Sequence, residues 1–107
     1  MTAERVTRDG MVAVLVSGGF GAGWSSWGGG EEEVLLFHPL LVEAKEKRLS
    51  WSKVEVILAE MGHPHVYMGG WGDVEIEWLP VGTRFDIEEY DGSETLRIIT
   101  PDYGWVA

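Results

Sequence analysis

Residues 18–30, with the sequence GGFGAGWSSWGGG, form the stretch whose residue types and spacing could bind a ligand. Seven of these residues are glycine, which lets backbone N–H groups approach a ligand closely. The two tryptophans could stack on a planar base or ring. This interpretation predicts a ligand-binding set made of Gly21, Gly23, Trp24, Ser25 and Trp27.

The same stretch has a structural interpretation, in which both tryptophans cover the core and the glycines permit tight turns. A long flexible linker would not normally hold two large apolar residues. We therefore expect an ordered loop with at least one of Trp24 and Trp27 buried.

The glycines and serines do not fit the common phosphate-binding and hydrolase motifs. The chain has no G-x-x-x-x-G-K-[ST] motif. It also lacks G-x-G-x-x-G, because the residue three positions after Gly21 is Trp24. Ser25 and Ser26 stand in GWSSWG, which is not G-x-S-x-G, and no neighbouring histidine or aspartate can be assigned as their base.

The histidines do not predict a metal centre. His63 and His65 lie two residues apart and Asp73 follows, but a metal site needs converging ligands and this pair falls in a predicted helix-to-strand turn. His38 precedes a proline and is expected to stand at the entry of a helix. The many carboxylates lack the contrasting surroundings that separate an acid from a base. We expect no metal, no cofactor and no enzymatic activity.

Charge and composition narrow the function classes further. The chain has 107 residues, 18 acidic and 8 basic, with a formal net charge of −10 and no cysteine. This charge disfavours direct binding to nucleic acid or to anionic membranes. Absence of cysteine suits a reducing compartment. No apolar run approaches the roughly 20 residues needed to span a bilayer, and the polar N-terminus does not resemble a secretory signal, so a cytoplasmic location is expected.

Hydrophobic patterns predict an α+β fold in one domain over residues 1–107, with a mostly antiparallel sheet and two short helices on one face. Strands are expected at residues 11–18 and 65–68, with a β-meander after that. The apolar run at 31–38 fits either a strand or the start of a helix. One helix is expected at about 39–48. A second should begin at Ser52, which has capping-box spacing with Glu55, and end before Gly62.

The turns of the meander predict a strand register. Asp91-Gly92 is a strong type I′ hairpin signal that sets Phe85 opposite Ile98, Ile87 opposite Leu96 and Asp86 opposite Arg97. A four-residue loop at 80–83 would set Trp78 opposite Phe85 and Ile76 opposite Ile87.

The predicted pairing across the loop at 80–83 places acidic side chains opposite one another. Residues 73–102 hold nine acidic residues and two arginines, which is −7 of the −10. In the predicted register Glu77 lies opposite Asp86 and Glu75 opposite Glu88, and like charges across a strand pair are destabilising. A solvated face would explain these carboxylates, and so would a surface that docks on a basic protein partner.

Two stretches, a glycine-rich one near the N-terminus and an acidic one near the C-terminus, together resemble a known group of sequences. GFGAGWSSW near the N-terminus and WLPVGTRFDIEEYDGSE near the C-terminus are similar to stretches of small proteins from phage and prophage genomes. The resemblance implies an inhibitor of a bacterial defence or nucleic-acid-handling protein, and it carries no catalytic role. We therefore expect a non-enzymatic protein that binds a basic host partner through Glu75, Glu77, Asp86 and Glu88. The alternative is a protein that sequesters a nucleotide-like small molecule at the glycine and tryptophan loop.

Overall fold

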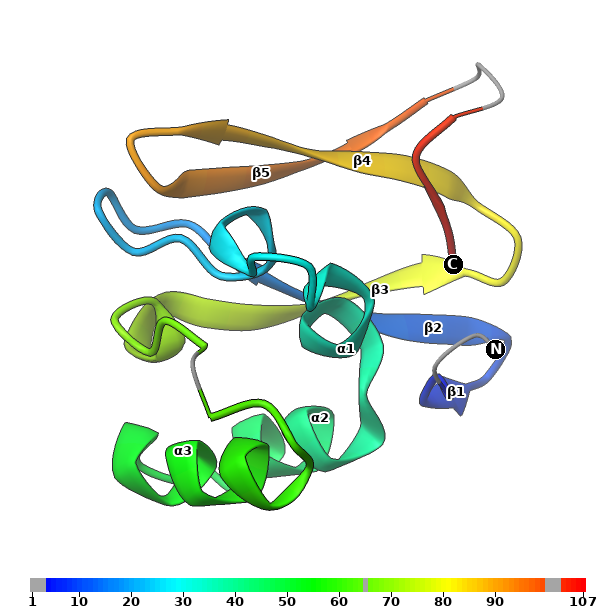
Figure 1. The fold of residues 1–107 in the computed structure, drawn as a ribbon. Helices are drawn as coiled ribbons and strands as arrows, with labels where there is room; N and C mark the ends of the chain where they lie inside the picture. Colours follow the sequence, from blue (N-terminus) through cyan, green and yellow to red (C-terminus); the bar gives the residue numbers. More distant parts are fainter. Residues whose placement is uncertain (1–3, 65, 100–102) are drawn as a thin grey trace.

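The fold consists of two small antiparallel sheets stacked on each other, with two helices against the outer face of one sheet (Figure 1). The computed structural model describes residues 4–64, 66–99 and 103–107. The first sheet has the order β1-β2-β3 and the second has the order β5-β4-β6. The strands are β1 (Thr7–Arg8), β2 (Met11–Ser17), β3 (Val74–Pro80), β4 (Arg84–Tyr90), β5 (Ser93–Ile98) and β6 (Trp105–Val106). The α+β prediction is confirmed.

Strand β2 connects two hydrophobic cores because both of its faces are covered. Ala13 and Leu15 belong to the core between the first sheet and helices α2 and α3, whereas Val12, Val14 and Val16 belong to the core between the two sheets. All five residues are at most 5% exposed. A strand buried on both faces needs a continuous apolar run rather than an alternating one, which is the pattern that predicted this strand.

The helices are α1 (Glu32–Phe37), α2 (Pro39–Glu46) and α3 (Trp51–Glu60), with short 3-10 helices η1 (Ser25–Trp27) and η2 (Trp71–Asp73). His38 begins α2 as predicted, because its Nδ1 accepts a hydrogen bond from the Leu40 N–H at 3.1 Å. The predicted start of α3 is wrong in detail, since Ser50 is the N-cap and makes no side-chain capping hydrogen bond. Gly62 ends the helix with a φ of 92°.

The run at 31–38, which fitted a strand or the start of a helix, contains a helix, and the predicted strand at 65–68 is wrong. Residues 32–37 form α1, in which Leu35, Leu36 and Phe37 are all fully buried. Leu35 packs in the helix-side core and the next two residues pack in the core between the sheets. A helix buried on several sides loses its amphipathic period, so its apolar run resembles a strand. In the segment 65–68, residues 66–68 form no strand, and His65 lies outside the described residues.

The two hairpin predictions have opposite outcomes. Strands β4 and β5 pair as expected, with Phe85 opposite Ile98, and the turn residues Asp91 and Gly92 have φ values of 48° and 85°. The predicted pairing of residues 74–80 with 84–90 is wrong. Strand β3 pairs along its whole length with β2, and the chain crosses to the second sheet between Pro80 and Arg84.

The crossing separates side chains that the predicted register had placed together. Trp78 and Ile76 pack against the helix-side core, while Phe85 and Ile87 belong to the core between the sheets. Phe85 instead packs near Phe37, with ring centroids 6.0 Å apart. Strand β3 therefore pairs with the edge of the long buried strand β2, and β4 belongs to the second sheet.

Candidate binding surface around the glycine and tryptophan loop

A buried carboxylate organises the glycine and tryptophan loop. Glu94 on β5 is only 4% exposed. One of its oxygens accepts hydrogen bonds from the backbone N–H groups of Trp24 at 2.8 Å and Ser26 at 2.9 Å, and from the Ser26 hydroxyl at 2.5 Å. The other oxygen accepts from the Ser17 N–H at 3.1 Å. A charged acceptor makes stronger hydrogen bonds than a neutral one, so Glu94 fixes the loop to the β4–β5 hairpin.

Glu94 was not among the site residues predicted from the sequence, although the predicted register contained the signal for it. Residues 94, 96 and 98 of β5 share one face, and that register placed Leu96 on the face toward the core. A carboxylate at position 94 was therefore directed inward, where it needs hydrogen-bond donors. The loop and the last residue of β2 supply those donors from 68 to 77 positions away along the chain.

Further hydrogen bonds join the loop to the hairpin and to the segment before η2. The Gly21 N–H donates to the Asp91 carbonyl, and the Ser93 hydroxyl donates to the Gly18 carbonyl at 3.0 Å. The Tyr67 hydroxyl donates to the Gly21 carbonyl at 2.9 Å. The expectation of an ordered loop is confirmed. Several of its backbone N–H groups already bind acceptors within the chain, which argues against a phosphate-binding role.

The predicted ligand-binding residues separate into buried and exposed positions. Trp24 is 1% exposed, and its Nε1 donates to the Leu35 carbonyl at 2.7 Å. Ser25 is 2% exposed. Trp24 therefore has no face on which a ligand could stack, and the expected burial of at least one tryptophan is confirmed. Trp27, in contrast, is 38% exposed.

Trp27 is held in place by two close backbone approaches. A Cβ atom added at Gly23 would lie 2.3 Å from the Trp27 ring, and one added at Gly92 would lie 2.9 Å from it. Only glycine leaves space for the indole at these two positions. The Trp27 ring also contacts the Tyr67 ring, with centroids 5.2 Å apart at an interplanar angle of 63°.

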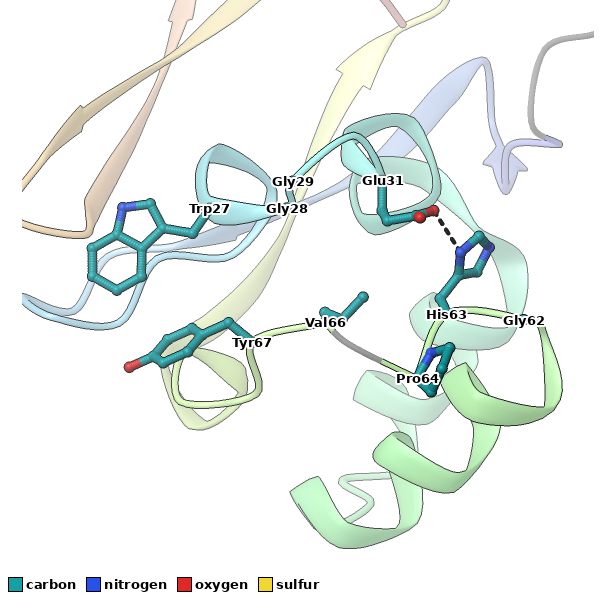
Figure 2. A pocket seen from close by; sticks show the side chains of 9 residues that line it. All are labelled: Trp27, Gly28, Gly29, Glu31, Gly62, His63, Pro64, Val66 and Tyr67. Atoms are coloured by element: carbon teal, nitrogen blue, oxygen red, sulfur yellow. Dashed lines mark ion pairs between the residues drawn. The ribbon is translucent and has the colours of Figure 1, made fainter.

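A hollow of about 290 Å³ lies beside these two aromatic rings. Figure 2 shows Trp27 and Tyr67 at one end of it and the pair of Glu31 and His63 at the other. The His63 Nδ1 lies 2.5 Å from the Glu31 Oε2. The lining residues are Trp27, Gly28, Gly29, Glu31, Gly62, His63, Pro64, Val66 and Tyr67.

A second exposed aromatic pair lies at the tip of the loop. Phe20 is 74% exposed and Tyr90, at the end of β4, is 72% exposed. Their ring centroids are 6.3 Å apart in an edge-to-face arrangement. The loop and the β4–β5 turn project side by side at one end of the molecule (Figure 1), so these rings form one outward-facing surface.

The predicted acidic ladder is wrong, because its two halves belong to different sheets. Glu75 and Glu77 on β3 lie opposite Val16 and Val14 of β2. Residues directly opposite share a face, so both carboxylates lie on the face of the first sheet that is directed toward the second. Burial raises the pKa of Glu77, and the neighbouring Glu75 carboxylate raises it further.

Asp86 and Glu88 are on the outer face of the second sheet. They alternate with Phe85, which is fully buried between the sheets. Arg97 pairs with Asp86 through two hydrogen bonds of 3.0 and 2.7 Å and reaches the Glu88 carboxylate at 3.2 Å. The hydrogen bonds from Arg97 lower the pKa of Asp86. These two carboxylates are compensated, and the four together do not form one docking face.

The described residues include no cluster of three or more histidine, aspartate or glutamate side chains that could hold a metal ion. Ser26, one of the two loop serines, donates its hydroxyl hydrogen bond to Glu94. Within the same ranges, no helix has the length and apolar character needed to cross a bilayer. No protein-family model, curated protein or solved structure matches this chain.

Proposed function

We propose that this chain is a protein-binding module whose loop and hairpin end, formed by residues 18–22 and 88–92, docks on a basic surface of another protein. The observation that carries the proposal is the contact between Phe20 and Tyr90, which are 74% and 72% exposed. Large exposed rings in contact with each other are typical of interaction sites. Aromatic residues are also enriched among the side chains that contribute most to protein interfaces.

The rigidity of this end supports the proposal. Glu94 and the hydrogen bond between Gly21 and Asp91 hold the loop against the hairpin. The loop therefore does not need to be ordered when a partner binds, and preorganisation of this kind reduces the entropic cost of association.

The charge around the aromatic pair indicates the kind of partner. Asp73 contacts Gly19 closely, since a Cβ on that glycine would lie 2.5 Å from the carboxyl group. Glu89 and Asp91 flank Tyr90 in the hairpin and are exposed. Within the described parts of the chain, Glu89 and Asp91 form no ion pair, and Asp73 interacts electrostatically with Lys45. A partner surface with lysine or arginine around an apolar hollow would complement them.

Proteins that bind nucleic acid offer basic surfaces of this kind. That class agrees with the phage resemblance, which also favours an inhibitory role. The docking surface now proposed differs from the four carboxylates predicted from the sequence, because the aromatic pair supplies its centre and Asp73, Glu89 and Asp91 supply its rim.

Photo-crosslinking in bacterial cells tests this proposal. A benzophenone amino acid replaces Phe20 in one variant and Tyr90 in a second. In a third, the control, it replaces Val81, which is 59% exposed in the connection between β3 and β4 at the other end of the molecule (Figure 1). We expect the same discrete protein adduct from positions 20 and 90, weakened when salt is added to a cell lysate before irradiation, and no such adduct from position 81. Equal labelling from all three positions, or none from the first two, would contradict the proposal.

A further inference from the structure

We infer that the hollow beside Trp27 is a binding site for a small planar nitrogen heterocycle that presents N–H donors, such as an amino-bearing nucleobase. This inference is independent of the docking surface, since neither Phe20 nor Tyr90 lines the hollow. It rests on the aromatic rings, the carboxylate and the size of the space (Figure 2).

The aromatic end of the hollow is suited to a planar ring. Trp27 and Tyr67 are 38% and 43% exposed, so each ring keeps part of its surface accessible. Their positions are fixed, because Trp27 lies against Gly23 and Gly92 and the Tyr67 hydroxyl binds the Gly21 carbonyl. Stacking of a base on a fixed aromatic side chain is favourable and tolerates different bases.

The polar end of the hollow selects among planar rings. An ionised carboxylate only accepts hydrogen bonds, and one oxygen of Glu31 lies 2.5 Å from the His63 Nδ1. Both residues line the hollow, so the Glu31 carboxylate lies within reach of a ligand bound there. Both side chains are partly buried, with exposed fractions of 36% for Glu31 and 22% for His63. A ligand with an amino group beside a ring nitrogen would match this acceptor, as cytosine does with carboxylates in protein–DNA complexes.

The same groups disfavour phosphate as the recognised element. No lysine or arginine lines the hollow as described, and the chain carries a net charge of −10. The volume of about 290 Å³ is at the lower limit of ligand pockets, which are about 300 to 1,000 Å³. A base or a nucleoside fits these limits better than a dinucleotide.

Isothermal titration calorimetry with single nucleosides tests the inference. The probes are cytidine, adenosine and guanosine, which carry amino groups, uridine, which does not, and cytidine monophosphate. We expect at least one amino-bearing nucleoside to bind more than about 10-fold tighter than uridine, because the uracil carbonyls oppose the Glu31 carboxylate. Addition of the phosphate should not strengthen binding.

Two variants locate the site. Glu31→Gln keeps the side-chain size and should weaken binding by about 10-fold or more, whereas the matched control Glu32→Gln, next in the chain and outside the hollow, should bind like the wild type. Trp27→Ala should lose about 5- to 150-fold, with its folding checked by a urea melt. Phe20→Ser should retain nucleoside binding, which separates this site from the docking surface.

Several results would overturn the inference. These are no binding by any nucleoside at millimolar concentration, equal binding of uridine, or unchanged binding by Glu31→Gln. Tighter binding of the monophosphate than of cytidine would also overturn it, since a phosphate site would then be responsible.

Discussion

Replacing Glu94 with glutamine should separate the glycine and tryptophan loop from the hairpin and destabilise the fold. The Glu94 carboxylate accepts four hydrogen bonds while only 4% exposed. A glutamine amide has one oxygen, so its NH₂ group must face at least one donor. If the amide oxygen binds Trp24 and Ser26, the NH₂ group faces the Ser17 N–H and both donors lack an acceptor.

The cost follows from these bonds. Loss of one hydrogen bond to a charged group costs about 1.5 to 3 kcal/mol, and the remaining bonds lose their charge assistance. Burying an amide instead of a carboxylate offsets part of this loss. We expect a net loss of about 2 to 4 kcal/mol, a large share of the roughly 5 to 15 kcal/mol by which domains are stable.

Urea denaturation at neutral pH measures the free energy of unfolding, and hydrogen exchange locates the change. The amides of Ser17, Trp24 and Ser26 should exchange faster in Glu94→Gln. The control is Glu88→Gln on the same hairpin, whose exposed carboxylate is paired with Arg97 and whose loss should cost less than about 1 kcal/mol. A Glu94→Gln variant within about 0.5 kcal/mol of the wild type would refute the structural role of this carboxylate.

Three other substitutions test the core, a helix cap and the acidic strand. Phe85→Ala removes a fully buried ring 6.0 Å from the Phe37 ring and should cost about 3 kcal/mol or more in urea melts; a cost under about 1 kcal/mol would contradict its place in the core. Burial lowers the pKa of His38, whose Nδ1 accepts a hydrogen bond from the Leu40 N–H. The neutral imidazole should therefore stabilise the fold above its unfolded pKa of about 6.5, and this stabilisation should be lost as the pH falls through the folded pKa. His38→Asn should reduce this loss between about pH 7.5 and pH 5, and an unchanged pH dependence of unfolding would argue against the cap. Glu77→Gln should raise the free energy of unfolding by a few tenths of a kcal/mol at neutral pH. Burial and the neighbouring Glu75 carboxylate raise the pKa of Glu77, so the fold disfavours its ionised form. A lower melting temperature of the variant would show that the charge is stabilising.

Signals confined to a few neighbouring residues predicted much of the fold. The apolar run of β2, the proline at the start of α2, the helical period of α3 and the Asp91-Gly92 turn each agree with the structure. Each depends on backbone preferences or on side-chain spacing within one element, which the sequence displays directly.

Pairing between elements could not be predicted in the same way. Strand β3 had two possible partners, β2 and β4, and its alternating pattern fitted both. The choice depends on β2, whose buried run needs cover on both faces and along both edges. That requirement belongs to the whole fold, so the predicted ladder of Glu75 and Glu77 with Asp86 and Glu88 was wrong.

The candidate site shows the same division. Local patterns predicted that the stretch of glycine and tryptophan is ordered and that the hairpin turns at Asp91 and Gly92, and the composition fixes the large negative charge. The contacts between distant segments follow from the folded chain alone: Glu94 accepts the N–H of Trp24 from 70 positions away, Trp27 lies against the hairpin, and Phe20 meets Tyr90 at the surface. The physical reason is that a buried carboxylate must find donors wherever the fold supplies them, and no local pattern of residues records which segment will do so.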